Sequence, residues 1–135
     1  NPSSVAAARE KIGGELAADN AFWLALRDHA LPFFDSGLTL WRLALPPATP
    51  NLALDASTCI DWAGTQRWLL THADADTVRT EARRYGGHAA CFRHPGTQPA
   101  PLHPLPSPLS AVHERLKQAF DPAGILNPGR MYAQL

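Results

Sequence analysis

Proline divides this chain into the stretches in which regular structure can form. Its 135 residues include 13 prolines, about twice the usual proportion. Because proline lacks a backbone N–H and is excluded from helix interiors and central strands, each cluster of prolines must lie between elements. One cluster occupies positions 46, 47 and 50, and six of the fifteen residues at 94–108 are proline. This second cluster predicts a stiff, extended connection without a core of its own.

Runs of apolar residues between these clusters predict four strands. The clearest run precedes the first proline cluster, and two shorter runs flank a three-residue loop with a central glycine, which is typical of a β-hairpin. A fourth run follows a glycine pair. The predicted strands are 38–45, 58–62, 66–70 and 88–93.

Hydrophobic spacing and capping residues predict four helices. Asp19 or Asn20 is expected to cap the second helix, and Ser107 the last. The first and third helices each run from a valine into a glycine pair, which suggests an α-then-β unit used twice, with a weak strand at 15–17 in the first copy. The predicted helices are 5–12, 21–29, 78–85 and 108–120.

This mixed order of helices and strands, with one hairpin, predicts an α+β fold, namely a ferredoxin-like, split β-α-β sheet with helices packed on it. Each helix of that arrangement follows a strand, whereas this chain begins at a helix. Either the pattern is imperfect, or one or more leading strands are missing in front of Ser3, and we expect the second. The sheet edge left open would pair two copies as a homodimer. The length of the chain predicts a single domain over 1–135.

Charge and composition exclude several classes of protein. Twelve basic and twelve acidic residues leave a net charge of zero, so the basic surface of a nucleic-acid-binding protein is missing. No apolar run is long enough to span a membrane, and no signal peptide is visible. Cys59 and Cys91 lie in apolar runs without metal-ligand spacing, which favours buried thiols in a reducing compartment. The alternative is a disulfide or a reactive thiol.

Motifs for metal, nucleophilic or phosphate chemistry are missing from the sequence. The six histidines form no H-E-x-x-H or equivalent spacing, so no metal site is predicted. Neither G-x-S-x-G, nor G-x-G-x-x-G, nor a Walker motif occurs, and the chain has no phosphate cradle of its own. His94 and His103 flank the proline-rich connection and are either ordinary surface residues or part of a cleft. No catalytic residue is assigned.

The most informative segment is 120–130, which reads Phe-Asp-Pro-Ala-Gly-Ile-Leu-Asn-Pro-Gly-Arg. Asn127 precedes a proline and is expected to be extended. Pro128 and Gly129 fit the central positions of a type II turn, which would hold the Asn127 amide and the Arg130 guanidinium on fixed backbone. The alternative is a helix stop followed by an ordinary turn in the tail.

This segment, D-P-x-G-I-x-N-P-G-R, resembles the C-terminal motif of FAD-linked oxidases and dehydrogenases that act on 2-hydroxy acids. Further pieces are similar to one branch of that family, the FAD-binding subunit of bacterial glycolate oxidases, and they occur in the right order over most of 5–132. The metal-associated histidine motif of the related catalytic subunit is missing. The matching pieces are Phe22-Trp23-x-x-Leu26-Arg27, Pro32-Phe33-Phe34, Leu40-Trp41-Arg42-Leu43, Asp61-Trp62-Ala63-Gly64-x-Gln66-Arg67-Trp68, Gly86-Gly87-His88-Ala89 and His103-Pro104-Leu105.

The resemblance implies that the chain is the cap, or substrate, domain of a longer flavoprotein, with its motif tail at 121–135. FAD would be held mainly by a domain absent here, while the cap covers the flavin and helps to form the pocket for a 2-hydroxy acid such as glycolate. The resemblance also implies a second flavin subunit and an iron–sulfur subunit as partners, in the cytoplasm or peripherally at the inner face of the cytoplasmic membrane. The isolated chain is expected to be inactive.

Candidate substrate residues lie in the matched segments. A small carboxylate is bound best by a planar cation, so Arg42 and Arg67 are predicted to bind substrate, together with His103. Alternation after the hairpin places Arg67 opposite Trp68 and therefore outward. The alternative is that both arginines only lay their stems over apolar surface with their charges in water.

The turn in the tail carries the predicted flavin contacts. Asn127, Gly129 and Arg130 are expected to contact the flavin, because the turn fixes their positions in the motif that resembles the family's. A different class of function stays open beside this one. It is a stand-alone, ferredoxin-like module that binds a ligand or a protein and has no enzymatic activity.

Overall fold

The computed structural model describes residues 2–13, 19–97 and 100–135. Where the sequence predicts a single domain over 1–135, the contacts within the chain group into two compact units, 1–35 and 36–135. The weak strand expected at 15–17 lies outside the described residues.

The first unit is helical. Helix α1 (Pro2–Ile12) buries none of its residues and ends at Gly13, whose positive φ of 76° suits glycine. Helix α2 (Ala21–Arg27) begins where the Asp19 carboxylate accepts the Ala21 N–H at 2.9 Å, which confirms one of the two caps predicted. The chain then forms a 3-10 turn, η1 (Pro32–Phe34). Within this unit the His29 ring is stacked on Phe34, with centroids 4.3 Å apart.

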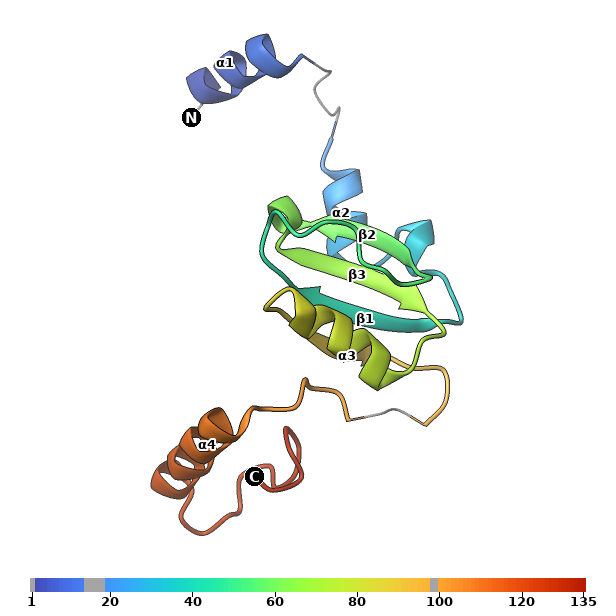
Figure 1. The fold of residues 1–135 in the computed structure, drawn as a ribbon. Helices are drawn as coiled ribbons and strands as arrows, with labels where there is room; N and C mark the ends of the chain where they lie inside the picture. Colours follow the sequence, from blue (N-terminus) through green and yellow to red (C-terminus); the bar gives the residue numbers. More distant parts are fainter. Residues whose placement is uncertain (1, 14–18, 98–99) are drawn as a thin grey trace. The chain divides into compact units, whose positions relative to one another are not determined.

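The second unit is built on a four-stranded antiparallel sheet (Figure 1). Its strand order is β2-β3-β1-β4, and helix α3 (Ala75–Arg84) joins β3 to β4. This is the order of a split β-α-β sheet, so the predicted α+β fold class is confirmed. The connection between β1 and β2 contains no helix. The strands are β1 (Thr39–Ala44), β2 (Ser57–Asp61), β3 (Gln66–Thr71) and β4 (His88–Arg93).

Local capping explains where the observed elements differ from those predicted. Helix α3 begins three residues before the predicted Val78, because the Asp74 carboxylate accepts the Thr77 N–H at 2.9 Å. Trp62 was expected to end a strand but lies in a 3-10 turn, η2 (Trp62–Gly64). Ser107 does not cap the last helix: α4 (Ser107–Phe120) already includes it, and Pro106 stands at the cap position.

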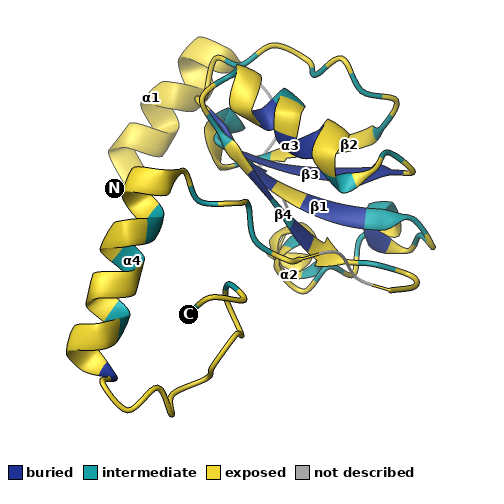
Figure 2. Cartoon of the chain, turned by 60° about the horizontal axis from the view of Figure 1, so that its bottom comes forward, coloured by how far each residue is buried: buried dark blue, intermediate teal, exposed yellow. Residues whose placement is uncertain are grey.

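The core lies between the sheet and α3 (Figure 2). Arg79 on α3 is buried, places its guanidinium 5.5 Å from the Trp41 ring, and donates to the carbonyls of Ala100 and Leu102, the latter at 2.9 Å. These bonds fix the middle of the proline-rich connection against α3. The buried core residues are Trp41, Leu43, Leu45, Leu69, Val78, Ala82, Ala89 and Cys91.

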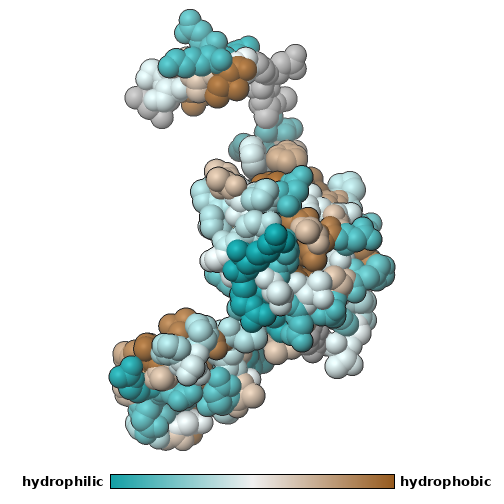
Figure 3. Space-filling model, in the orientation of Figure 1, coloured by the Kyte–Doolittle hydropathy of each residue, from teal (hydrophilic) through white to brown (hydrophobic). Residues whose placement is uncertain are grey.

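Helix α4 has an apolar stripe that no described residue buries. Its members follow the helical spacing of three and four residues that the sequence predicts, yet all are exposed, and Phe120 is 81% exposed. Hydrophobic side chains accordingly show on the surface of this part of the chain (Figure 3). The stripe consists of Leu109, Val112, Leu116 and Phe120.

Candidate functional site

A hollow of about 410 Å³ opens beside the ends of the central strands. It is formed by the end of β1, the η2 turn with the start of β3, and the turn that leads from α3 into β4. These are three of the segments on which the sequence resemblance depends. The lining residues are Arg42, Ala44, Leu45, Pro46, Trp62, Thr65, Gln66, Gly86, Gly87 and His88.

Arg42 is the cation of this hollow. Its side chain is exposed, and its Nε donates to Oε1 of Gln66 on the neighbouring strand at 2.7 Å. Gln66 is only 8% exposed, and its amide nitrogen donates to Asp61 Oδ2 on β2 at 3.4 Å. Three strands therefore contribute one residue each to a polar row, and Arg42 stands at the end of the row that faces the hollow.

The strained turn η2 forms part of the rim of the hollow. Trp62 and Ala63 adopt positive φ values of 48° and 51°, and Gly64 follows at 91°. Such values are rare for residues other than glycine. A Cβ on Gly64 would lie 2.5 Å from the Pro47 carbonyl oxygen, so glycine is required there. The turn leaves Trp62 67% exposed at the rim of the hollow.

Arg67 does not point outward, and that prediction is wrong. It is 2% exposed, and its guanidinium donates to the Pro50 carbonyl at 2.7 Å and to the Thr49 carbonyl. Because β3 is a central strand, all six of its residues are buried and alternation gives it no solvent face. Arg67 anchors the connection that stands where a helix would join β1 to β2, and it does not line the hollow.

His103 lies beside the hollow, outside its lining. Its Nδ1 accepts the backbone N–H of Ala89 at 3.1 Å, and its ring is 6.5 Å from that of the lining residue His88. Burial, followed by the positive charges of Arg83 and Arg79, lowers the pKa of His103. The imidazole therefore serves chiefly as a neutral hydrogen-bond acceptor for the sheet.

The predicted turn of the tail is confirmed, but its first residue differs. The Arg130 N–H donates to the Asn127 carbonyl at 3.2 Å, with Pro128 and Gly129 between them and Gly129 at a φ of 68°. Asn127 has a φ of 47° and is not extended, because asparagine tolerates the left-handed region that most residues avoid before proline.

A second hollow, of about 510 Å³, lies between this tail and α4. Asn127 and Arg130 line it together with apolar residues of both segments. Gly129 is in the turn but not among the lining residues. The other lining residues are His113, Leu116, Lys117, Phe120, Leu126, Met131 and Leu135.

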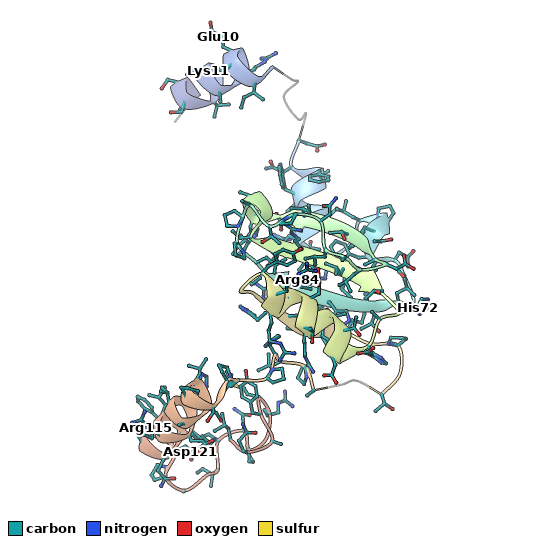
Figure 4. All side chains as sticks on the ribbon, viewed as in Figure 1. Glu10, Lys11, His72, Arg84, Arg115 and Asp121 are labelled. Atoms are coloured by element: carbon teal, nitrogen blue, oxygen red, sulfur yellow. The ribbon has the colours of Figure 1, made fainter. Side chains whose placement is uncertain are left out.

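Asp121 holds the tail against the end of α4 (Figure 4). Its buried carboxylate accepts the N–H groups of Ile125 and Leu126 at 3.0 and 2.9 Å and pairs with Lys117 Nζ at 2.7 Å. The hydrogen bond from Lys117, and then the one from Leu126, lower the pKa of Asp121. The aspartate of the tail motif thus acts on the backbone, a role that the sequence alone does not indicate.

Within the described ranges, no three His, Cys, Asp or Glu side chains gather as a metal site would require. Nor does any described helix combine the length and apolarity needed to cross a bilayer.

The chain is similar to known proteins over two ranges, one short and one almost complete. The family described as FAD linked oxidases, C-terminal domain, matches residues 106–131. The chain is 46% identical over 132 residues to "Glycolate oxidase subunit GlcE" of Escherichia coli (strain K12), a match that covers 98% of this chain and 37% of that protein. No solved structure matches significantly. The predicted resemblance is therefore confirmed: residues 106–131 carry the C-terminal-domain pattern of the FAD linked oxidases, and nearly the whole chain is similar to part of a glycolate oxidase subunit.

Proposed function

We propose that this chain is the substrate-binding part of an FAD-dependent oxidoreductase that acts on a small 2-hydroxy acid, with glycolate as the preferred candidate. The observation that carries the proposal is the hollow at Arg42. It joins three segments that are distant in sequence and on which the resemblance depends, and the relative that is similar over nearly the whole chain is a glycolate oxidase subunit.

Arg42 is proposed to bind the substrate carboxylate. A guanidinium binds a carboxylate through two parallel hydrogen bonds, and such charge-assisted bonds are about twice as strong as neutral ones. Trp62 and the glycine-lined wall would cover the bound acid and exclude water, which strengthens the electrostatic attraction. Arg67 is left out of this role, because its nitrogens serve backbone carbonyls.

The side chains of the tail suit a flavin-binding surface better than a solvent-exposed terminus. The second hollow combines the Asn127 amide and the Arg130 guanidinium with the apolar side chains of Leu116, Phe120 and Met131. An isoalloxazine ring, flat and apolar with a polar edge, needs that combination. When bound, FAD would supply the acceptor for the hydride that leaves the α-carbon of the acid. Asn127 and Arg130 would bind and orient the ring edge, and Gly129 would fix the turn between them.

The rest of the flavoprotein is proposed to supply the remaining parts. The chain spans little more than a third of the curated relative it matches, and its sequence has no motif for the pyrophosphate of FAD. A separate domain would therefore hold most of the cofactor. The exposed stripe of α4 is suited to be covered by that domain or by further subunits, including a second flavin subunit and an iron–sulfur subunit, in the cytoplasm or at the inner face of its membrane.

Pairing of two copies through a sheet edge is also proposed for the isolated chain, now with a specific edge. The outer side of β4 is occupied, because Cys91 N–H donates to the Pro101 carbonyl at 2.7 Å and Ala89 N–H to His103. The edge that would pair is therefore β2 (Ser57–Asp61).

The experiment that tests the proposed function compares the 135-residue chain with the full-length protein. Purified with FAD, the full-length protein should be yellow, and together with its proposed partner subunits it should reduce a dye acceptor in the presence of glycolate, whereas the isolated chain should be colourless and inactive. If the isolated chain bound FAD at micromolar affinity in titration calorimetry, the proposal that a separate domain holds most of the cofactor would be wrong. A full-length protein free of flavin would favour the stand-alone binding module.

A further inference from the structure

We infer that Gln66 is a positioning residue that holds Arg42 for the substrate carboxylate, with Asp61 fixing the orientation of the Gln66 amide. The inference rests on the proposed function of the hollow and goes beyond it, because it explains how an exposed arginine on a strand is kept ready for an anion.

The bond from Arg42 Nε to Gln66 Oε1 leaves the far end of the guanidinium available. No partner for the two terminal nitrogens of Arg42 is found among the residues that the structure describes. These two nitrogens form the edge that binds a carboxylate in parallel. Because an unrestrained arginine loses considerable side-chain entropy on binding, a preformed Nε bond makes the site more effective.

Asp61 determines which way the Gln66 amide faces. Its Oδ2 accepts from Gln66 Nε2 at 3.4 Å, and its Oδ1 accepts the N–H of Trp62 at 2.7 Å. Gln66 must therefore present its oxygen to Arg42. The same carboxylate is bonded to the first residue of the strained turn, so one residue links the orientation of Arg42 to the rim of the hollow.

A neutral residue between Arg42 and Asp61 has a chemical purpose. A carboxylate at position 66 would form an ion pair with Arg42 and compete with the substrate for the guanidinium. Glutamine provides the acceptor oxygen without the negative charge, and it separates the charge of Arg42 from that of Asp61. The arrangement therefore suits an anionic ligand.

The test is a set of variants of the full-length protein, each assayed for KM and kcat with glycolate and for FAD content. Gln66→Glu should raise KM about tenfold, because the introduced carboxylate pairs with the guanidinium that the substrate carboxylate needs. The matched control is Gln118→Glu, which adds the same charge at an exposed position of α4 and should leave KM unchanged.

A double-mutant cycle separates this inference from the proposed function. Gln66→Leu should raise KM about tenfold, with kcat and FAD content near wild type, and should have little further effect once Arg42 is replaced by alanine. If Arg42→Ala raises KM but Gln66→Glu and Gln66→Leu do not, the positioning role is overturned and the proposed function stands. If Arg42→Ala leaves KM unchanged, both are overturned. Should the leucine variant not fold, the KM of the near-isosteric glutamate variant, compared with that of Gln118→Glu, decides.

Discussion

His103 Nδ1 accepts a hydrogen bond from the backbone N–H of Ala89 at 3.1 Å. A side chain thus takes the place of a neighbouring strand at the outer edge of β4. Two residues further along β4, the Cys91 N–H finds its partner in the Pro101 carbonyl. A proline-rich segment cannot pair as a regular strand, because its prolines carry no N–H. It can still supply acceptors, one from the backbone and one from an imidazole, and these satisfy the outer donors of β4.

This arrangement predicts a loss of stability in acid. The pKa of His103 in the folded chain lies below its ordinary value of 6.5, so the unfolded chain takes up the proton first as the pH falls. Burial, and then the positive charges of Arg83 and Arg79, disfavour the protonated ring, so the stability that the neutral imidazole contributes should be complete above pH 6.5 and decline below it. Urea unfolding of the chain between pH 5 and 8 measures this.

The control for that experiment is His72→Gln, which removes an exposed histidine and should keep the pH dependence. His103→Gln retains an acceptor that cannot be protonated and should flatten the dependence between pH 5 and 7. An equally steep decline in both variants would show that His103 is not the titrating group.

Gly87 should tolerate no side chain. A Cβ at this position would lie 2.3 Å from the Ala44 carbonyl oxygen, which belongs to the backbone and cannot rotate away. Gly87→Ala is therefore expected to cost about 1–3 kcal/mol of unfolding free energy. Gly37→Ala is the matched control, since no atom lies within 4 Å of its Cβ position. Equal unfolding midpoints for the two variants would contradict the close approach of the backbones.

Arg67→Met should destabilise the sheet unit without weakening glycolate binding. The substitution removes the bonds to the carbonyls of Thr49 and Pro50, and a hydrogen bond from a charged donor contributes about 1.5–3 kcal/mol. Chemical unfolding measures the loss, and KM of the full-length protein should stay within about twofold. A large rise in KM with unchanged stability would restore Arg67 as a substrate residue.

Asn127→Ala and Arg130→Ala should weaken the retention of FAD by the full-length protein. Each removes one polar group from the hollow at the tail. Arg130→Ala leaves the Pro128–Gly129 turn in place, whereas Asn127→Ala also strains it, because position 127 has a φ of 47°. The fraction of FAD kept after gel filtration measures the effect. About a tenfold weaker affinity is expected for the loss of the charged Arg130 donor, and a smaller loss for the neutral amide of Asn127. Arg115→Ala on the exposed side of α4 is the control. Normal FAD content in both variants would contradict the proposal that the tail contacts the flavin.

Features that depend only on residues close together in the sequence were predictable, and features that depend on distant neighbours were not. The four strands, the hairpin and the turn at Pro128–Gly129 were predictable, because hydrophobic spacing and glycine or proline chemistry act within a few residues. The burial of Arg67 was not predictable, since it depends on which strands flank β3. The role of Gln66 as the acceptor for Arg42 was missed for the same reason. A polar glutamine at the start of an otherwise apolar strand was the one signal that could have indicated it. The left-handed Trp62 and Ala63 follow from contacts around the turn, which no local propensity favours.

The most direct test of the proposed site is the KM for glycolate of the full-length Arg42→Ala variant, measured beside Arg84→Ala, which removes an arginine exposed on α3. The loss of a charge-assisted bond of about 1.5–3 kcal/mol predicts a KM about ten- to a hundredfold higher for Arg42→Ala. FAD content should be normal in both variants, and Arg84→Ala should keep the wild-type KM. An Arg42→Ala variant with normal FAD content and an unchanged KM would contradict the assignment of this hollow to the substrate.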